Sequence, residues 1–285
     1  MPLLNLSIKI VLFLIGFVVV LSLFQFYTSI RPPRYYSNNT PADYDLKYEN
    51  VSFTTSDNIK IDAWVIESEK ANGTIIVGHG YPFDKGNVMS LALFLYPEYN
   101  LVYYDHRYFG KSSGAYTTVG MKEVEDVKAA INYVQKRFGK KEPIALYGVS
   151  LSASAMIMSK PQVNAIIADS AYANLENMIK HVYNMFSVFK YPFVKLTNLY
   201  SILLFHSHPK DISPALAAKE INVPILLIHG DKDSQIPVEN AYQIIKQNPN
   251  IESWIVKGSD HIGAHHMHKA EYEKKVKDFL KKNMN

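Results

Sequence analysis

Residues 144–158 (IALYGVSLSASAMIM) change from a strand-like pattern to a helix-like pattern with almost no loop between them. The first half is a short apolar run, and the second half is rich in Ala, Met and Leu, which favour helix. A chain that turns this sharply holds its middle residue, Ser150, on a strained and exposed turn. Residues 148–152 therefore predict a nucleophile elbow, although a buried serine at a helix N-cap would give a similar pattern.

Composition limits the class of protein. The chain has 285 residues, 48% hydrophobic and 20% charged, which is enough for one large α/β domain or two smaller ones. The net charge is +4 and the basic residues are scattered, which argues against nucleic-acid binding. Cysteine is absent, which excludes disulfides, cysteine zinc ligands and a cysteine nucleophile but leaves the compartment open.

The first thirty residues differ from the rest of the chain. Residues 10–30 carry no charge and are long enough to cross a bilayer as one helix. The run is longer than the apolar part of a usual signal peptide, and no clear small-residue cleavage site follows it. We therefore predict a single-pass membrane protein, with residues 1–34 forming the anchor and the start of a linker. A cleaved signal peptide is the alternative.

The membrane face of the remaining chain is left open by the sequence. Arg31 and Arg34 outnumber Lys9, which favours a cytoplasmic position for the part after the anchor. A short tail before a single early span commonly stays inside the cell, which favours the opposite orientation. We prefer the orientation with the part after the anchor outside the cytoplasm.

Beyond the anchor, residues 35–285 are predicted to form one domain. Apolar strand-like runs alternate with helical patterns, which is typical of a mostly parallel central sheet with helices on both faces. The expected strands are residues 51–56, 59–66, 74–77, 101–104, 143–147, 165–168, 224–228 and 251–256. The expected helices include residues 87–96, 119–138, 151–158 and 269–282.

Residues 171–218 break this alternation, because the segment is far longer than a crossover between strands needs. It is also crowded with aromatic side chains. We predict a helical cap insertion here, and an ordinary crossover helix with core aromatics is the alternative. The aromatic residues are Tyr172, Tyr183, Phe186, Phe189, Tyr191, Phe193, Tyr200 and Phe205.

A serine nucleophile needs a base and an acid that orients the base. Asp231 and Asp233 follow the expected strand at 224–228, and His261 follows the last strand. Carboxyl ends of parallel strands meet at one edge of a sheet, so these side chains are expected near Ser150. Either aspartate could orient His261, and both could instead be turn formers.

The oxyanion formed during acyl transfer also needs hydrogen-bond donors. Residues 78–81 (Gly-His-Gly-Tyr) follow a buried strand, and their glycines let the backbone approach a reacting carbonyl. We predict that the backbone amides of Tyr81 and Leu151 form the oxyanion hole. A tight turn without a ligand is the alternative for these glycines.

Four motifs together carry a family resemblance: residues 78–80 (GHG), 105–112 (DHRYFGKS), 148–152 (GVSLS) and 229–233 (HGDKD), the last with the later His261. From about residue 44 onward the chain resembles an α/β-hydrolase, in particular the membrane-anchored, BEM46-like and dienelactone-hydrolase-like serine hydrolases. Two features depart from the family pattern. Ser152 stands where a glycine is usual, and residues 108–110 (Tyr-Phe-Gly) differ from many relatives.

The resemblance implies roles for individual residues. It makes Asp233 the acid and leaves Asp231 to shape the turn. It implies that Asp105 and Arg107 form a structural pair that braces the loop beneath the site. The catalytic triad would then be Ser150, Asp233 and His261, working by acyl transfer without a metal or an organic cofactor.

The substrate class follows from the aromatic insertion and the anchor. Both favour a small-molecule ester with an apolar or lipid-like acyl group, so an esterase, lipase or thioesterase is expected. A serine peptidase or amidase on the same fold is one alternative, although prolyl-oligopeptidase-like proteins usually carry a propeller for which this chain has no room. A catalytically silent binding protein is another.

Histidines near the C-terminus raise the question of a metal site. His265, His266 and His268 cluster there, and His265 and His268 have helical spacing. No carboxylate motif completes a ligand set, so we expect these histidines to be surface or helix-start residues rather than metal ligands.

Overall fold

The computed structural model describes residues 2–284, so the outer limits 1 and 285 of the two predicted domains lie outside it. The chain divides into two compact units. The sheet unit consists of Pro33–Ala173 and Ser213–Asn285, and the helical unit consists of Met1–Pro32 and Asn174–Ile212. The predicted domain limits at residues 34/35 and the insertion limits 171–218 stay predictions.

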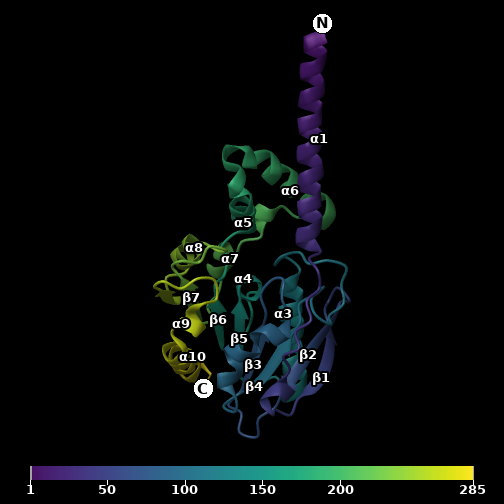
Figure 1. Cartoon of the computed structure of the whole chain (residues 1–285). Helices are drawn as coiled ribbons and strands as arrows, with labels where there is room; N and C mark the ends of the chain where they lie inside the picture. Colours follow the sequence, from purple (N-terminus) through teal and green to yellow (C-terminus); the bar gives the residue numbers. More distant parts are fainter. Residues whose placement is uncertain (1, 285) are drawn as a thin grey trace. The chain divides into compact units, whose positions relative to one another are not determined.

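The sheet unit is built on one sheet, which within residues 2–284 has eight strands in the order β1-β2-β4-β3-β5-β6-β7-β8 (Figure 1). β1 and β2 pair antiparallel, as do β2 and β4, and the remaining neighbours are parallel. The strands are β1 Glu49–Thr54, β2 Lys60–Ile66, β3 Thr74–Gly78, β4 Asn100–Tyr104, β5 Ile144–Val149, β6 Ala165–Asp169, β7 Ile225–Gly230 and β8 Glu252–Val256.

Helices cover both faces of this sheet. Successive side chains of a strand point to opposite faces, and on β3 Ile76 joins one apolar cluster while Ile75 and Val77 join the other. The first cluster lies under α3 (Glu123–Phe138), α4 (Leu151–Met158), α7 (Pro214–Ala218) and α8 (Glu239–Gln247); the second lies under α2 (Met89–Ala92), α9 (Ala264–Met267) and α10 (Lys269–Asn283). The predicted α/β-hydrolase fold class is confirmed.

Two predicted helices differ from the structure. The helix expected over residues 87–96 is broken into η2 (Lys85–Val88), α2 and η3 (Leu93–Leu95). The helix expected from residue 119 begins only at Glu123. Val119 has a φ of 52°, and the Glu123 carboxylate accepts hydrogen bonds from the Thr118 and Gly120 amides at 2.9 and 2.8 Å. This carboxylate fixes a turn before the helix, which an apolar pattern cannot reveal.

The helical unit contains the N-terminal helix and most of the predicted insertion. Its elements are α1 (Pro2–Ile30), α5 (Leu175–Val182), η4 (Tyr183–Phe189), α6 (Lys190–Phe205) and η5 (Pro209–Asp211). Within α1, Leu6–Ile30 has a mean hydropathy of 2.7 and is long and apolar enough to cross a membrane. The rings of Phe186 and Phe193 stack at 4.6 Å in the core of this unit.

α1 and α6 pack against each other (Figure 1). Ser22 is fully buried on α1, and its hydroxyl lies 3.1 Å from the Tyr200 hydroxyl of α6. The ring of Phe26 lies 5.6 Å from that of Tyr200 and 5.9 Å from that of Phe205. The N-terminal helix is therefore part of the packing of the helical unit.

Candidate active site

The turn between β5 and α4 has the geometry of a nucleophile elbow. Ser150 has φ 52° and ψ −110°, a strained conformation for a residue with a side chain. Its amide donates to the Asp169 carbonyl at 2.8 Å. A Cβ on Gly148 would lie 2.7 Å from the Ala153 nitrogen, so the helix can approach the strand this closely only if residue 148 is glycine.

Three side chains predicted from the sequence meet at this turn. His261 Nε2 lies 3.1 Å from the Ser150 hydroxyl, and His261 Nδ1 lies 2.7 Å from Asp233 Oδ2. An ionised carboxylate only accepts hydrogen bonds, so Nδ1 carries the proton, and in the neutral imidazole the Nε2 lone pair faces the serine. We call this set the Ser150 row.

The two candidate aspartates have different partners. Asp233 Oδ1 accepts the backbone amides of Gln235 and Ile236 at 2.9 and 2.8 Å, which leaves Oδ2 directed at His261. Asp231 Oδ1 instead accepts the Gly258 amide at 2.6 Å and ties two loops together. The geometry thus brings Asp233, and not Asp231, to His261.

The predicted oxyanion donors come from the loop after β3 and from the start of α4, both beside Ser150. A Cβ on Gly80 would lie 3.2 Å from the Ser150 Cβ, so the loop after β3 passes directly against the elbow. Tyr81 follows in that loop. Leu151 is the first residue of α4, where backbone amides have no partner within the helix. An oxyanion hole formed by Tyr81 and Leu151 stays a prediction.

Ser152, the residue that departs from the family pattern, belongs to a second row of Ser, His and Asp. His106 Nε2 lies 2.7 Å from the Ser152 hydroxyl, and His106 Nδ1 lies 3.2 Å from Asp126 Oδ2. The Ser152 hydroxyl donates to the His79 carbonyl at 2.6 Å. We call this set the Ser152 row; Ser152, His106 and Asp126 are all fully buried. Ser152 thereby links the elbow to the loop after β3, which a glycine could not do.

His79 holds the same loop from inside. Its Nε2 accepts the His106 amide at 2.9 Å, so its Nδ1 carries the proton and donates to the Gly80 carbonyl at 2.8 Å. Burial is the main cause that lowers the pKa of His79 to about 4. A neutral imidazole is required for this pair of hydrogen bonds.

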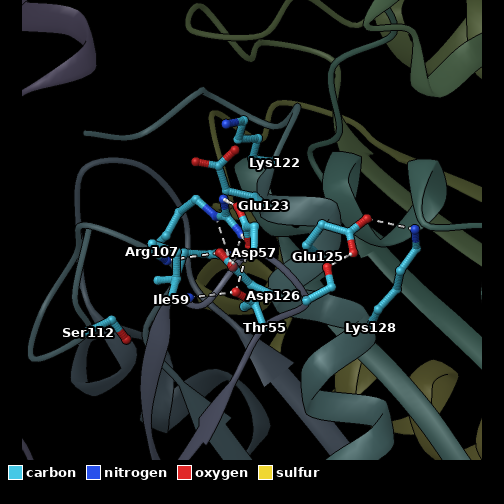
Figure 2. Close-up of polar contacts among 12 residues, drawn as sticks. Thr55, Asp57, Ile59, Arg107, Ser112, Lys122, Glu123, Glu125, Asp126 and Lys128 are labelled. Atoms are coloured by element: carbon cyan, nitrogen blue, oxygen red, sulfur yellow. Dashed lines mark hydrogen bonds and ion pairs between the residues drawn. The ribbon is translucent and has the colours of Figure 1, made fainter. Parts of the chain in front are cut away.

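Arg107 and Asp105 brace the loop after β4, but through different partners rather than as a pair. Figure 2 shows Arg107 between Asp57 and Asp126, which it binds at 2.7 Å through Nη1 and at 2.9 Å through Nε. The hydrogen bond from Arg107 lowers the pKa of Asp57 to about 2. Asp105 instead binds the Lys85 ammonium at 2.6 Å.

A supporting network beneath the His261 loop was not predicted from the sequence. Asp169, at the end of β6, accepts the hydroxyls of Tyr272 and Ser170, both at 2.9 Å. The Ser170 hydroxyl in turn accepts the Ile262 amide at 3.2 Å, beside His261. Burial raises the pKa of Asp169. A carboxylate at the carboxyl end of a parallel strand was the available signal, since such ends form the site edge.

Two of the C-terminal histidines, His265 and His268, pack against aromatic side chains. The His265 ring stacks on Phe94 at 6.1 Å and meets the edge of Tyr272 at 5.2 Å. His268 lies edge-on to Trp254 at 6.3 Å. Among the residues that the structure describes, no group of three His, Cys, Asp or Glu side chains is arranged to hold a metal ion.

Comparisons with known proteins agree with this architecture. The sequence pattern of the prolyl oligopeptidase family matches residues 111–285. The esterase Pf2001 of Pyrococcus furiosus has 29% sequence identity and a TM-score of 0.75, and the alignment covers 90% of this chain and 99% of that chain. The predicted resemblance to α/β hydrolases is thus confirmed, and the BEM46-like branch stays a prediction.

Two curated relatives extend the comparison. The uncharacterized protein YqkD of Bacillus subtilis is 24% identical over 222 residues, which are 74% of this chain and 72% of that protein. An uncharacterized membrane protein of Saccharomyces cerevisiae, YNL320W, is 21% identical over 219 residues, 74% of this chain and 72% of that protein. The family match and the esterase together support a serine hydrolase in a general sense.

Proposed function

Because the chain belongs to the prolyl oligopeptidase family, we propose that it is a serine hydrolase that cleaves carboxylic esters through an acyl-enzyme on Ser150. The observation that carries this proposal is the Ser150 row, in which His261 bridges Ser150 and Asp233 at 3.1 and 2.7 Å. The acyl group is proposed to be apolar or lipid-like.

The reaction follows from the hydrogen bonds of the row. His261 Nε2 removes the Ser150 proton as the hydroxyl oxygen attacks the ester carbonyl, and then delivers that proton to the departing alcohol. Asp233 keeps the imidazole in the required tautomer and stabilises the imidazolium. The amides of Tyr81 and Leu151 bind the oxyanion; each such donor is worth about 3 kcal/mol of transition-state stabilisation. Water then cleaves the acyl-enzyme by the same steps.

We propose an ester rather than an amide as the substrate because the 29% identical structure, whose alignment covers 90% of this chain, is an esterase. The family name favours a second candidate, a peptidase or amidase, which would use the same Ser150 row. The two functions differ in the leaving group and can be separated by assay.

A retained membrane anchor fits the apolar substrate. Ser22 and Phe26 of α1 are buried against Tyr200 of α6, and a cleaved signal peptide would take these contacts away. We infer that α1 remains on the mature protein as a single membrane span. We prefer the orientation that places the sheet unit outside the cytoplasm, which protease protection in sealed, oriented vesicles would test.

The full chain in detergent should be assayed on p-nitrophenyl esters of increasing acyl length, with a matched p-nitroanilide as the amide control. We expect ester turnover that rises with acyl length, and covalent labelling by a fluorophosphonate that disappears in Ser150→Ala. Turnover of the anilide without ester turnover would favour the peptidase. Absence of both turnover and labelling would contradict the proposal and favour a silent binding protein.

A further inference from the structure

The segments of the helical unit contact α1 in the order in which they follow one another along the chain. Burial on α1 begins at Val18 and recurs on one face at residues 21–22, 25–26 and 30, whereas residues 6–17 are all exposed. Val18 and Leu21 pack on the aromatic cluster of Tyr183 and Phe193. Five to eight residues later, Phe26 meets Phe205. α6 therefore runs parallel to α1, with η4 lying toward the middle of α1.

The length of α1 does not allow a membrane span that avoids this packing. A hydrocarbon core of about 30 Å needs about 20 helical residues. Such a span ends near Gln25 if it is counted from Leu6, the first residue of the candidate span, and near Ser29 if it is counted from Ile10, where the uncharged run begins, so it contains Val18 and Leu21 in both cases. Residues 6–17 alone cover only about 18 Å. The part of α1 that contacts η4 and the start of α6 thus lies within the hydrocarbon core, between its middle and the near headgroups.

The segment that lies at this depth exposes apolar side chains. Met185 is 79% exposed and Phe189 is 74% exposed, and Val182, Val188 and Tyr191 are also exposed. We call these five residues the apolar tip. Exposed aromatic and aliphatic groups gathered on one short segment mark an interaction surface rather than scattered surface residues.

Basic side chains accompany the apolar tip. Lys190 follows Phe189 directly, its ammonium lying 2.9 Å from the Asn184 side-chain oxygen, and Lys195 is exposed one turn further along α6. Long lysine side chains can keep their charge at the headgroups while their stems lie along apolar surface. This combination of apolar tip and flanking lysines is typical of segments that lie in the interfacial region of a bilayer.

We propose that the apolar tip inserts into the near leaflet of the membrane beside α1, so that the helical unit contacts lipid through both its anchor and its insertion. The partner is the lipid bilayer itself. The proposal rests on the proposed membrane span of α1, and it goes beyond it by assigning a second membrane contact. It implies that the insertion meets apolar substrate within the lipid phase.

The absence of cysteine from the sequence allows a direct test. Single cysteines would be introduced as Phe189→Cys in the apolar tip, Phe13→Cys in the exposed part of α1, and Tyr242→Cys on α8 of the sheet unit. Phe13 and Tyr242 are 72% and 52% exposed, so labelling should not disturb packing. Each full-length variant would carry the fluorophore NBD and be reconstituted in phosphatidylcholine vesicles.

We expect NBD at residues 189 and 13 to emit at shorter wavelength than NBD at 242, and to lose fluorescence several-fold when the lipids carry doxyl groups on their acyl chains. NBD at 242 should be unchanged by these lipids. Quenching at 13 without quenching at 189 would overturn the inference while leaving the anchor intact. Quenching at neither position would overturn the membrane span as well.

A functional measurement separates lipid insertion from association between two copies of the chain. Phe189→Asp should lower the ratio of turnover of a vesicle-embedded long-chain ester to turnover of a soluble short-chain ester several-fold, and Tyr242→Asp should leave that ratio unchanged. An unchanged ratio in Phe189→Asp, or energy transfer between labels at 189 in place of lipid quenching, would contradict the proposal.

Discussion

The Ser150 row and the Ser152 row contain the same three residue types, two positions apart at the serine, yet the serine hydroxyl has a different partner in each. In the Ser150 row, Asp233 fixes the proton on His261 Nδ1, so Nε2 is free to accept from the serine. In the Ser152 row, the Ser152 hydroxyl donates its proton to the His79 carbonyl at 2.6 Å, so this proton is not directed at His106 Nε2, which lies 2.7 Å from the same oxygen.

The two rows also differ in access. Ser150 retains 8% exposure on a strained turn, and Ser152, His106 and Asp126 have none. The residue types alone do not distinguish the two rows. The rows differ in the group that accepts the serine proton and in whether a substrate can reach the serine oxygen. Both differences depend on residues outside the rows.

Removing the serine of each row should give the largest contrast. Ser150→Ala is expected to lower kcat by at least about 10⁴-fold, because the acyl-enzyme cannot form, and to abolish fluorophosphonate labelling. Ser152→Ala should keep the labelling and lose less than tenfold in kcat. Steady-state turnover of the best p-nitrophenyl ester and gel-based labelling would measure this. Loss of labelling in Ser152→Ala, with Ser150→Ala still labelled, would exchange the roles of the rows.

The aspartates should differ in what they affect. Asp233→Asn is expected to lower kcat by about 10⁴-fold with little change in stability, because the amide favours the wrong tautomer of His261. Asp126→Asn should mainly lower the free energy of unfolding, since Asp126 also binds Arg107 at 2.9 Å. Parallel kcat and urea-unfolding measurements on both variants would decide; equal loss of kcat in the two would remove the distinction.

The structural part of Ser152 should appear as a loss of stability. Ser152→Ala leaves the buried His79 carbonyl and His106 Nε2 without their hydroxyl partner, which is expected to cost about 1–3 kcal/mol. Loosening of the loop after β3 should lower kcat less than tenfold. Ser154→Ala, which removes a buried hydroxyl on the opposite side of α4 from this network, is a useful comparison. No change in unfolding for Ser152→Ala would refute the assignment.

The smallest effect concerns pH. The pKa of His79 is lowered to about 4 in the folded chain, against about 6.5 when unfolded. The contribution of neutral His79 to the free energy of unfolding is thus fully present above pH 6.5. This contribution is lost as the pH falls toward 4, by at most about 1.4 kcal/mol per pH unit. His79→Gln should be less stable at pH 7 and lack this slope. Urea unfolding of both proteins at pH 7 and pH 5 would measure it; equal slopes would contradict the neutral His79.

Sequence alone was sufficient where neighbouring residues determine the structure. The elbow at Ser150 follows from small residues between an apolar strand and a helix, and the positions of Asp233 and His261 follow from their places after parallel strands. The fold class follows from the same alternation. These features depend on local pattern and on the general geometry of parallel sheets.

Contacts distant in sequence could not be predicted in this way. From the sequence, Ser152 could be identified only as a replacement for glycine, because its partners His79 and His106 lie in the loops after β3 and β4, far away along the chain. Arg107 and Asp105 were expected to pair with each other, but Arg107 forms an ion pair with Asp57 and Asp105 forms one with Lys85. The later start of α3 depends on the Glu123 side chain folding back on the preceding turn.

The buried hydroxyl of Ser22 has a practical consequence. Because it sits between the Val19 carbonyl at 2.9 Å and the Tyr200 hydroxyl at 3.1 Å, α1 contributes a sequence-specific face to its neighbours. Exchanging it for an unrelated hydrophobic helix, or trimming it away to obtain a soluble enzyme for crystallisation, would uncover Tyr200 and Phe205. Recombinant versions that begin after Pro32 should therefore aggregate unless Tyr200 and Phe205 are also replaced by polar residues.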